Sequence, residues 1–192
     1  MSTTPAHRQI SDGTNTLSPA NIPVESLPVV ELNVHQLRRA AALAYERNHS
    51  YTRIDGGDVY SSDSMMSHLI GIICEMAVAS AYSADVDMQT YRFGDDGTDL
   101  DIWDTTVDVK GTATTAMRRP ELLVKPYEYL SADLYFLAHI IEWGAESVRV
   151  RIHGYTDEET VTDREPRRHP GFDKNYVVEP SELTLPPWVR TD

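Results

Sequence analysis

Acidic side chains and one lysine are concentrated between Asp99 and Lys110, where the sequence reads DLDIWDTTVDVK. A tight turn at Asp104-Thr105 would fold this segment into a hairpin and place its aliphatic residues on one face. A slip of one residue would flip one strand, so the apolar pattern selects the pairing. The other face would then carry the charged side chains, which are Asp99, Asp101, Asp108 and Lys110.

The predicted pairing sets Asp101 directly opposite Asp108, which is unfavourable for two like charges. A divalent cation would offset this repulsion, and hard cations such as Mg²⁺ prefer oxygen ligands. Carboxylates with a neighbouring ammonium are also suited to binding and hydrolysing a phosphodiester. The alternative is a solvated acidic face, because acidic residues are common throughout this chain.

Glu75 is the only Asp, Glu, Lys or Arg between Ser64 and Ala84, within an otherwise apolar helical segment. A buried carboxylate costs several kcal/mol unless it is paired or bound to a metal. We therefore expect Glu75 to belong to an active site or a metal site. The alternative is a salt bridge with an arginine such as Arg38 or Arg47.

The order of these residues resembles the PD-(D/E)XK nuclease superfamily, which has the restriction-endonuclease-like fold. Members carry a helix glutamate, an aspartate that opens a strand, and an acidic-x-Lys triplet on the paired strand. The positions that match are Glu75, Asp99, Asp108 and Lys110, over a resemblance that spans about residues 64–153. Thr98 stands where many members have proline, and either Asp96 or Asp101 could take the place of Asp99.

The resemblance implies a metal-dependent nuclease that hydrolyses DNA. Mg²⁺, with Mn²⁺ as a substitute, would be held by Asp99 and Asp108, by the Val109 carbonyl, and by Glu75 directly or through water. Lys110 would orient or deprotonate the attacking water, or hold the phosphate. The short domain favours cutting directed by DNA structure, as in a Holliday junction resolvase. The alternative is a non-catalytic, acidic interaction or nucleic-acid-binding protein on the same fold.

Two short basic clusters are candidates for phosphate contacts beside this site. They are Arg118-Arg119 and Arg167-Arg168, and their alternative role is surface charge balance. A homodimer is compatible with a duplex substrate, since a duplex has two strands to cut.

Hydrophobic periodicity predicts a single α/β domain over residues 29–192, with a mixed central sheet of about five strands flanked by helices. Residues 1–28 are rich in Pro, Ser and Thr, which predicts a disordered or loosely attached arm. The predicted elements are helices over 33–47 and 64–82, a short helix over 120–130, and strands over 88–93, 100–103, 106–110, 132–141 and 147–152. We also expect the continuous apolar strand over 132–141 to be central and covered on both faces.

Composition excludes several classes of protein. The net charge of -13 argues against a general nucleic-acid or anionic-membrane coat, and the single cysteine, Cys74, excludes an internal disulfide. The apolar stretch over 69–82 is shorter than the ~20 residues that span a bilayer, so we expect a soluble, cytoplasmic protein without a membrane partner. Few lysines and many acidic residues suggest adaptation to a salt-rich cytosol.

Overall fold

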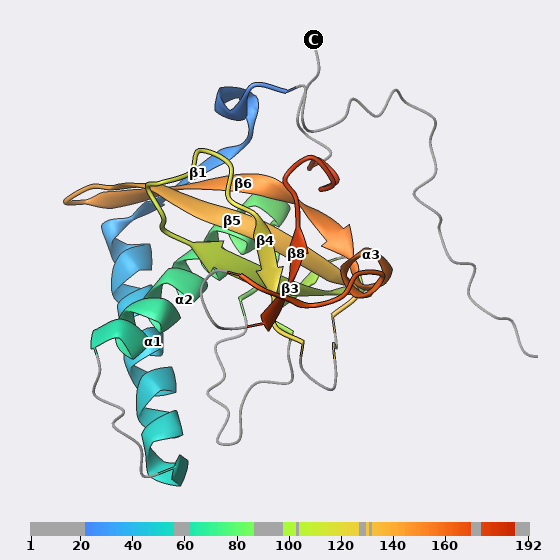
Figure 1. Cartoon of the computed structure of the whole chain (residues 1–192). Coiled ribbons are helices and arrows are strands. Elements are labelled where there is room, and N and C mark those ends of the chain that lie inside the picture. The colour runs from blue at the N-terminus through green and yellow to red at the C-terminus, as the bar shows by residue number, and fades with distance from the viewer. Residues whose placement is uncertain are drawn as a thin grey trace, which may run out of the picture.

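The main sheet of the protein has five strands in the order β1-β6-β5-β3-β2 (Figure 1). The computed structural model describes residues 22–55, 62–86, 98–102, 104–126, 130, 132–169 and 174–186, without the side chains of 49–55 and 62–64. β3 and β5 run parallel, whereas the other neighbours are antiparallel. The expected mixed α/β fold with five strands is therefore confirmed. The strands are β1 (Val29–Asn33), β2 (Leu100–Ile102), β3 (Thr105–Thr112), β5 (Leu134–Trp143) and β6 (Ser147–Asp157).

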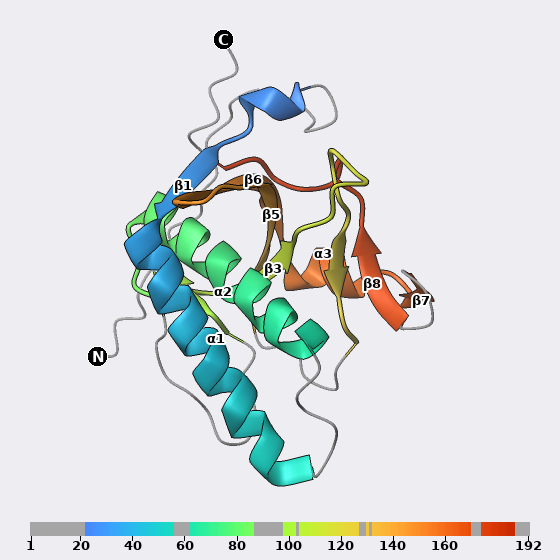
Figure 2. The same ribbon diagram turned by 90° about the vertical axis from the view of Figure 1, so that its left-hand side faces the viewer.

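Two long helices cover one face of this sheet (Figure 2). They are α1 (Val34–Asp55) and α2 (Ser62–Tyr82). α1 begins where the sequence indicates, since the Asn33 side chain accepts the backbone N–H groups of His35 and Gln36 at 2.9 and 3.2 Å. α2 is apolar on nearly every side because it lies between the sheet and α1.

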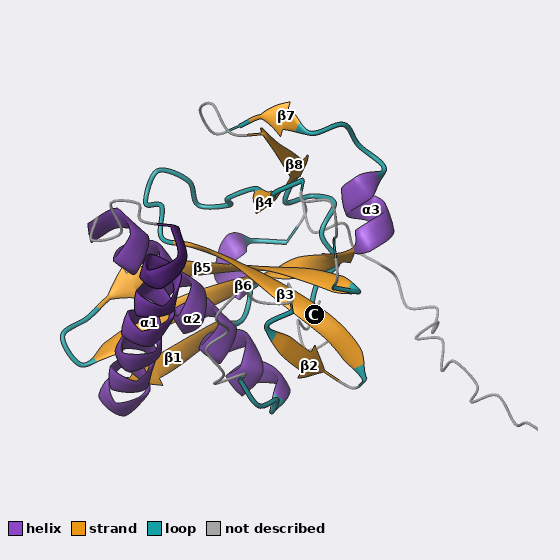
Figure 3. Ribbon diagram, turned by 90° about the horizontal axis from the view of Figure 1, so that it is seen from below, coloured by secondary structure: helices purple, strands orange, loops and turns teal. Residues whose placement is uncertain are grey.

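A small second sheet lies over the opposite face of the main sheet, with the order β4-β8-β7 (Figure 3). Its strands are β4 (Leu122–Val124), β7 (Arg167–Arg168) and β8 (Lys174–Val178), and the short helix α3 (Glu158–Thr162) packs beside it. Tyr135 and Leu137 of β5 share a hydrophobic cluster with this layer, while Phe136 and Ala138 belong to the cluster under the helices. β5 is thus central and covered on both faces, as predicted.

Part of α2, Met65–Tyr82, is long and apolar enough to cross a membrane by length and composition alone. The prediction that this segment is too short is therefore weak, because the helix begins before Leu69. The packing of this helix is a better argument against a membrane span than its length. Ile72, Ile73 and Val78 are buried in the core, as expected for a helix that packs between the sheet and α1.

Several sequence predictions need correction. Residues 22–28 do not belong to a loose arm, because Ile22, Val24 and Leu27 are buried around a 3₁₀ turn, Val24–Ser26. The helix expected over 120–130 is wrong where the structure describes it, since β4 forms there and pairs with β8. β1 was not predicted. The strand expected over 88–93 and the arm over 1–21 lie outside the described residues.

Candidate active site on the β2–β3 hairpin

The β2–β3 hairpin forms as predicted, but its turn lies one residue earlier than expected. Ile102 pairs with Thr105, and Asp104 of the turn has a left-handed φ of 62°, a conformation that Asp tolerates better than most residues. Every cross-strand partner therefore shifts by two residues, which leaves the apolar face intact. Asp101 pairs with Thr106 and is exposed, so the predicted Asp101–Asp108 repulsion does not occur.

Asp99 is the aspartate that the structure places against the triplet. Its backbone N–H donates to the Val107 carbonyl at 2.8 Å, and its Oδ2 accepts the Val109 N–H at 2.7 Å. These two bonds fix the buried Asp99 carboxylate beside the backbone that carries Asp108. Of the alternatives, Asp101 is exposed on β2 and Asp96 lies outside the described residues.

Asp108 and Lys110 form an ion pair two residues apart on β3, with Nζ 2.5 Å from Oδ2. Side chains alternate along a strand, so these two lie opposite the face that Val107 and Val109 turn toward the helices. Asp108 neighbours Tyr135 of β5 in the parallel register. Burial, followed by the negative charge of Asp108, raises the pKa of Tyr135 to about 12.

Glu75 lies in the helical layer, where it pairs with Arg47 of α1. Arg47 Nη1 is 3.2 Å from both carboxylate oxygens, and both side chains are largely buried. This salt bridge is the alternative that the sequence leaves open. The Arg47 charge, after burial, also lowers the pKa of the nearby His68.

The predicted site residues thus divide between two layers. The hairpin brings Asp99, Asp108, Val109 and Lys110 together, whereas Glu75 is held by α1. Within the described ranges, no three His, Cys, Asp or Glu side chains are close enough together to hold a metal ion. Val109 contacts Asp99 through its N–H, and metal ligation by its carbonyl stays a prediction.

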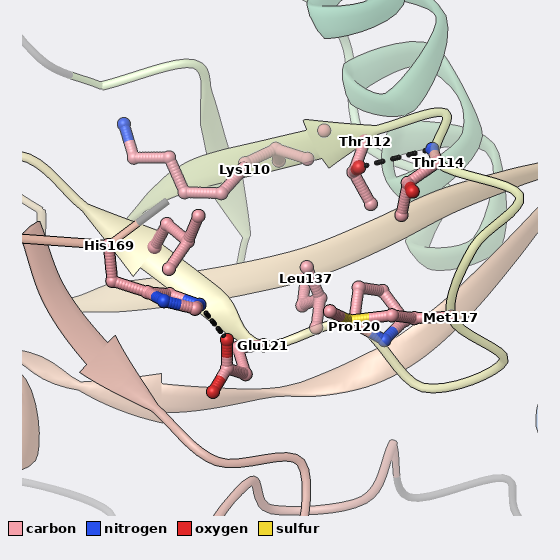
Figure 4. Close-up of a pocket in the computed structure, with 11 residues that line it drawn as sticks. Lys110, Thr112, Thr114, Met117, Pro120, Glu121, Leu137 and His169 are labelled. Atoms are coloured by element: carbon pink, nitrogen blue, oxygen red, sulfur yellow. Dashed lines mark hydrogen bonds and ion pairs between the residues drawn. The ribbon is translucent and has the colours of Figure 1, made fainter. Parts of the chain in front are cut away.

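A pocket of about 360 Å³ lies beside Lys110, between the main sheet and the small sheet (Figure 4). Lys110 and His169 lie toward one end, where His169 Nε2 contacts the Glu121 carboxylate. Leu137 of β5 lies between this end and the opposite end, where Thr112 and Thr114 lie. The rest of the wall comes from β3, β4 and the segment that joins them: Val109, Gly111, Thr112, Thr114, Met117, Pro120 and Leu123.

Both predicted basic clusters are adjacent in sequence to residues that line this pocket. Arg118-Arg119 lies between two lining residues, Met117 and Pro120, and Arg167-Arg168 directly precedes His169. Arg118 is 85% exposed and meets Glu25 at 3.4 Å, while Arg119 donates to the Ile22 carbonyl.

The second cluster belongs to β7. Arg167 contacts Glu121 and Glu179 at 3.6 and 3.4 Å, and Arg168 is exposed. The pocket itself was not predicted, because β4 and His169 come together only through non-local pairing. The predicted basic cluster Arg167-Arg168, which directly precedes His169, is the signal in the sequence that lies nearest to it.

Comparisons with protein-family models, with curated proteins and with solved structures give no match to this chain.

Proposed function

We propose that the chain is a magnesium-dependent nuclease of restriction-endonuclease-like fold, which hydrolyses DNA phosphodiester bonds at the β2–β3 hairpin. The observation that carries the proposal is the position of Asp99, anchored on Val109 beside the ion pair of Asp108 and Lys110. This arrangement gathers two buried carboxylates and one ammonium on adjacent strands at one end of the sheet order.

The donor set fits Mg²⁺ on chemical grounds. Mg²⁺ usually takes one or two carboxylates and fills its other positions with water and substrate phosphate, so Asp99 and Asp108 suffice. When bound, the ion would neutralise charge on the phosphate and acidify a water molecule. The same oxygen ligands suit Mn²⁺. Glu75 would join such a site only if it exchanged its Arg47 partner.

Lys110 supplies the second element of the chemistry. The Lys110 side chain remains one-third exposed although its ammonium touches Asp108, so it can reach a bound phosphate. A positive charge there would stabilise the negative charge that develops on the phosphate oxygens during hydrolysis. The Asp108 carboxylate holds this ammonium in place before substrate arrives.

Nuclease assays test the proposal directly. Linear, nicked and branched DNA, with RNA as a comparison, would be incubated with Mg²⁺, with Mn²⁺ or with EDTA, in low and high salt. We expect cleavage with either metal ion, none in EDTA, and a loss of at least about 100-fold for Asp108→Asn.

Asp101→Asn is the matched control, because it removes an exposed carboxylate from the same hairpin. This variant should cleave at the rate of the unmodified protein. Cleavage that persists in EDTA, or an Asp108→Asn variant with full activity, would contradict the assigned site.

One observation favours a second candidate, a non-catalytic interaction protein on this fold. Among the described residues, the three buried carboxylates all have protein partners: Glu75 has Arg47, Asp108 has Lys110, and Asp99 has the Val109 N–H. Calorimetric titration with Mn²⁺ separates the two functions. If the chain is a nuclease, Mn²⁺ should bind to it and should bind more weakly to Asp99→Asn. If it is a non-catalytic interaction protein, Mn²⁺ should not bind to the folded chain.

A further inference from the structure

We propose that the pocket beside Lys110 receives one unstacked nucleobase of the nucleic acid whose backbone is cut at the hairpin. The inference rests on the proposed nuclease function and specifies its substrate as nucleic acid with an unpaired nucleotide. The structural basis is the position of Lys110, which belongs to the proposed reaction centre and also lines the pocket.

The size and lining of the pocket suit a flat heterocycle. Its volume of about 360 Å³ falls within the range of small-ligand sites, about 300–1,000 Å³. Leu137, Met117 and Pro120 offer apolar surface for the faces of a ring. The His169 imidazole is a stacking group that proteins use for unstacked bases.

Polar groups in the same pocket could bind the edge of a base. Thr112 and Thr114 bring hydroxyl groups toward the end opposite His169, and the Glu121 carboxylate lies at the His169 end (Figure 4). Hydroxyl and carboxylate groups are able to satisfy the donors and acceptors of a nucleobase. A mixture of polar and apolar side chains of this kind favours a base over a bare phosphate.

The charges around the pocket favour a nucleic acid over an uncharged ligand. In the sequence, Arg118 and Arg119 follow Met117, and Arg167 and Arg168 precede His169. Arg118, Arg167 and Arg168 are exposed, although Arg118 and Arg167 also contact glutamates. The rest of the protein is strongly acidic, with a net charge of -13. A phosphate backbone would therefore be attracted to these exposed arginines more than to the rest of the acidic surface.

The position between two sheets dictates the form of the substrate. A base within a duplex is stacked on both faces and cannot enter a pocket between β3, β4 and β5. Extruding it costs a few kcal/mol, and the cost is least when the base is already unpaired. The pocket therefore selects bulged, branched or single-stranded nucleic acid over a continuous duplex.

The test uses the full chain and oligonucleotides that carry the fluorescent base 2-aminopurine, either fully paired or as a single unpaired nucleotide. Binding is measured in EDTA, so that no cleavage occurs. We expect a several-fold rise in fluorescence and at least about 10-fold tighter binding for the unpaired form. Equal affinity for the two forms would overturn the inference.

Two sets of variants locate the effect. Thr112→Phe fills the pocket from β3 and should abolish both the fluorescence rise and the preference, while paired DNA binds as before. Met117→Ala should weaken binding of the unpaired form several-fold. Met66→Ala is its matched control, because Met66 and Met117 are equally exposed, at 49% and 48%, and Met66 lies on α2. A Thr112→Phe variant that remains folded and keeps the preference would overturn the assignment of the pocket.

The two proposals fail in distinguishable ways. A protein that shows the preference in EDTA but cleaves nothing with Mg²⁺ retains the base pocket and loses the nuclease function. A protein that cleaves paired and unpaired DNA equally, with no fluorescence change, keeps its nuclease function and refutes the base pocket.

Discussion

Glu75 and Asp108 lie in opposite layers of the molecule, are almost equally buried at 5% and 9% exposure, and each pairs with one cation. The difference lies in the cation. Arg47 is enclosed between two helices and bonds to both oxygens of Glu75, whereas Lys110 lines a pocket. A buried carboxylate therefore does not by itself indicate a reactive site. Whether its cationic partner can contact a ligand is the better criterion. Glu75–Arg47 has the features of a pair that holds elements together, and Asp108–Lys110 those of a pair that can meet a ligand.

The largest expected effect concerns Lys110. Lys110→Met removes the ammonium that pairs with Asp108, and we expect cleavage to fall about 1,000-fold. It should lower the free energy of unfolding by about 1 to 2 kcal/mol, because the Lys110 side chain is partly exposed but its Asp108 partner is buried. Cleavage rates and urea unfolding curves measure both quantities. If Lys110→Met is strongly destabilised but its folded molecules cleave at the normal rate, the Asp108–Lys110 pair is structural and not part of the reaction centre.

Glu75→Leu should give the opposite result. Removing the Glu75 carboxylate from the largely buried Arg47 is expected to cost about 3 kcal/mol of unfolding free energy. The double variant Arg47→Met with Glu75→Leu should recover most of this stability, because apolar residues replace both charges. Urea unfolding of the two variants checks the prediction.

The activity of the same double variant then decides whether Glu75 has a catalytic role. We expect normal cleavage, since Glu75 pairs with Arg47 in the helical layer. A stable double variant without activity would return Glu75 to the reaction centre that the family resemblance implies.

Gly111 marks the point where β3 touches α2. A Cβ at Gly111 would lie 2.9 Å from Cys74 Sγ and 3.2 Å from the Ile70 carbonyl oxygen, so Gly111→Ala must push the helix away. We expect a loss of between about 1 and 3 kcal/mol in unfolding free energy. Gly71→Ala on α2 is the control, since its Cβ meets only Glu75 Oε1, at 3.7 Å. That variant should be unchanged or more stable by about 1 kcal/mol.

Stability should depend on pH through the layer opposite the helices. His153 is buried beside His139, with ring centroids 5.6 Å apart, and burial followed by the charge of neighbouring groups lowers its pKa to about 3. The folded state therefore holds the neutral ring. The unfolded state binds a proton below about pH 6.5, so this stability is complete above 6.5 and lost as the pH falls toward 3.

The expected loss from His153 is about 2 kcal/mol between pH 7 and pH 5. Urea unfolding at the two pH values measures it, and His153→Gln should flatten the dependence. His35→Gln, which alters an exposed histidine on α1, should leave the dependence unchanged. An unmodified protein with equal stability at pH 7 and pH 5 would contradict the prediction.

The smallest expected effect is that of salt. Acidic residues outnumber basic ones by 30 to 17, and their repulsion is screened when the Debye length falls from about 10 Å at 0.1 M to about 3 Å at 1 M. We expect the melting temperature to rise by a few degrees between ~0.1 and ~2 M chloride, equivalent to about 1 kcal/mol. Thermal unfolding by circular dichroism checks this, and a flat or falling melting temperature would refute salt adaptation.

The parts of the fold that were predicted correctly depend on local sequence patterns, such as the alternation of apolar residues along a strand. Alternation placed Leu100, Ile102, Val107 and Val109 on the face that the structure buries, and this assignment survives the error in the turn because a shift of two residues preserves the face. The all-round apolar character of α2 likewise predicted its burial.

Pairing between segments that are distant in the sequence could not be predicted. The small sheet joins Leu122–Val124 to Lys174–Val178, and neither segment has enough periodicity to identify its partner. β1 is short and includes Glu31 and Asn33, so it does not stand out from its surroundings. The choice of Arg47 as the partner of Glu75 also depends on how two helices pack, which their sequences do not specify.

The order of the main sheet has a consequence for how the chain folds. β5 and β6 are neighbours in sequence and pair as a hairpin, so they can form early, whereas β1 pairs with β6 across most of the chain, Val29 with Arg151. During synthesis β1 leaves the ribosome first but must wait for β6. Until it pairs, one edge of β6 keeps its backbone groups unpaired beside an apolar layer, a surface that favours association with other chains. We therefore expect substitutions that weaken β1 to slow folding and to lower the soluble yield.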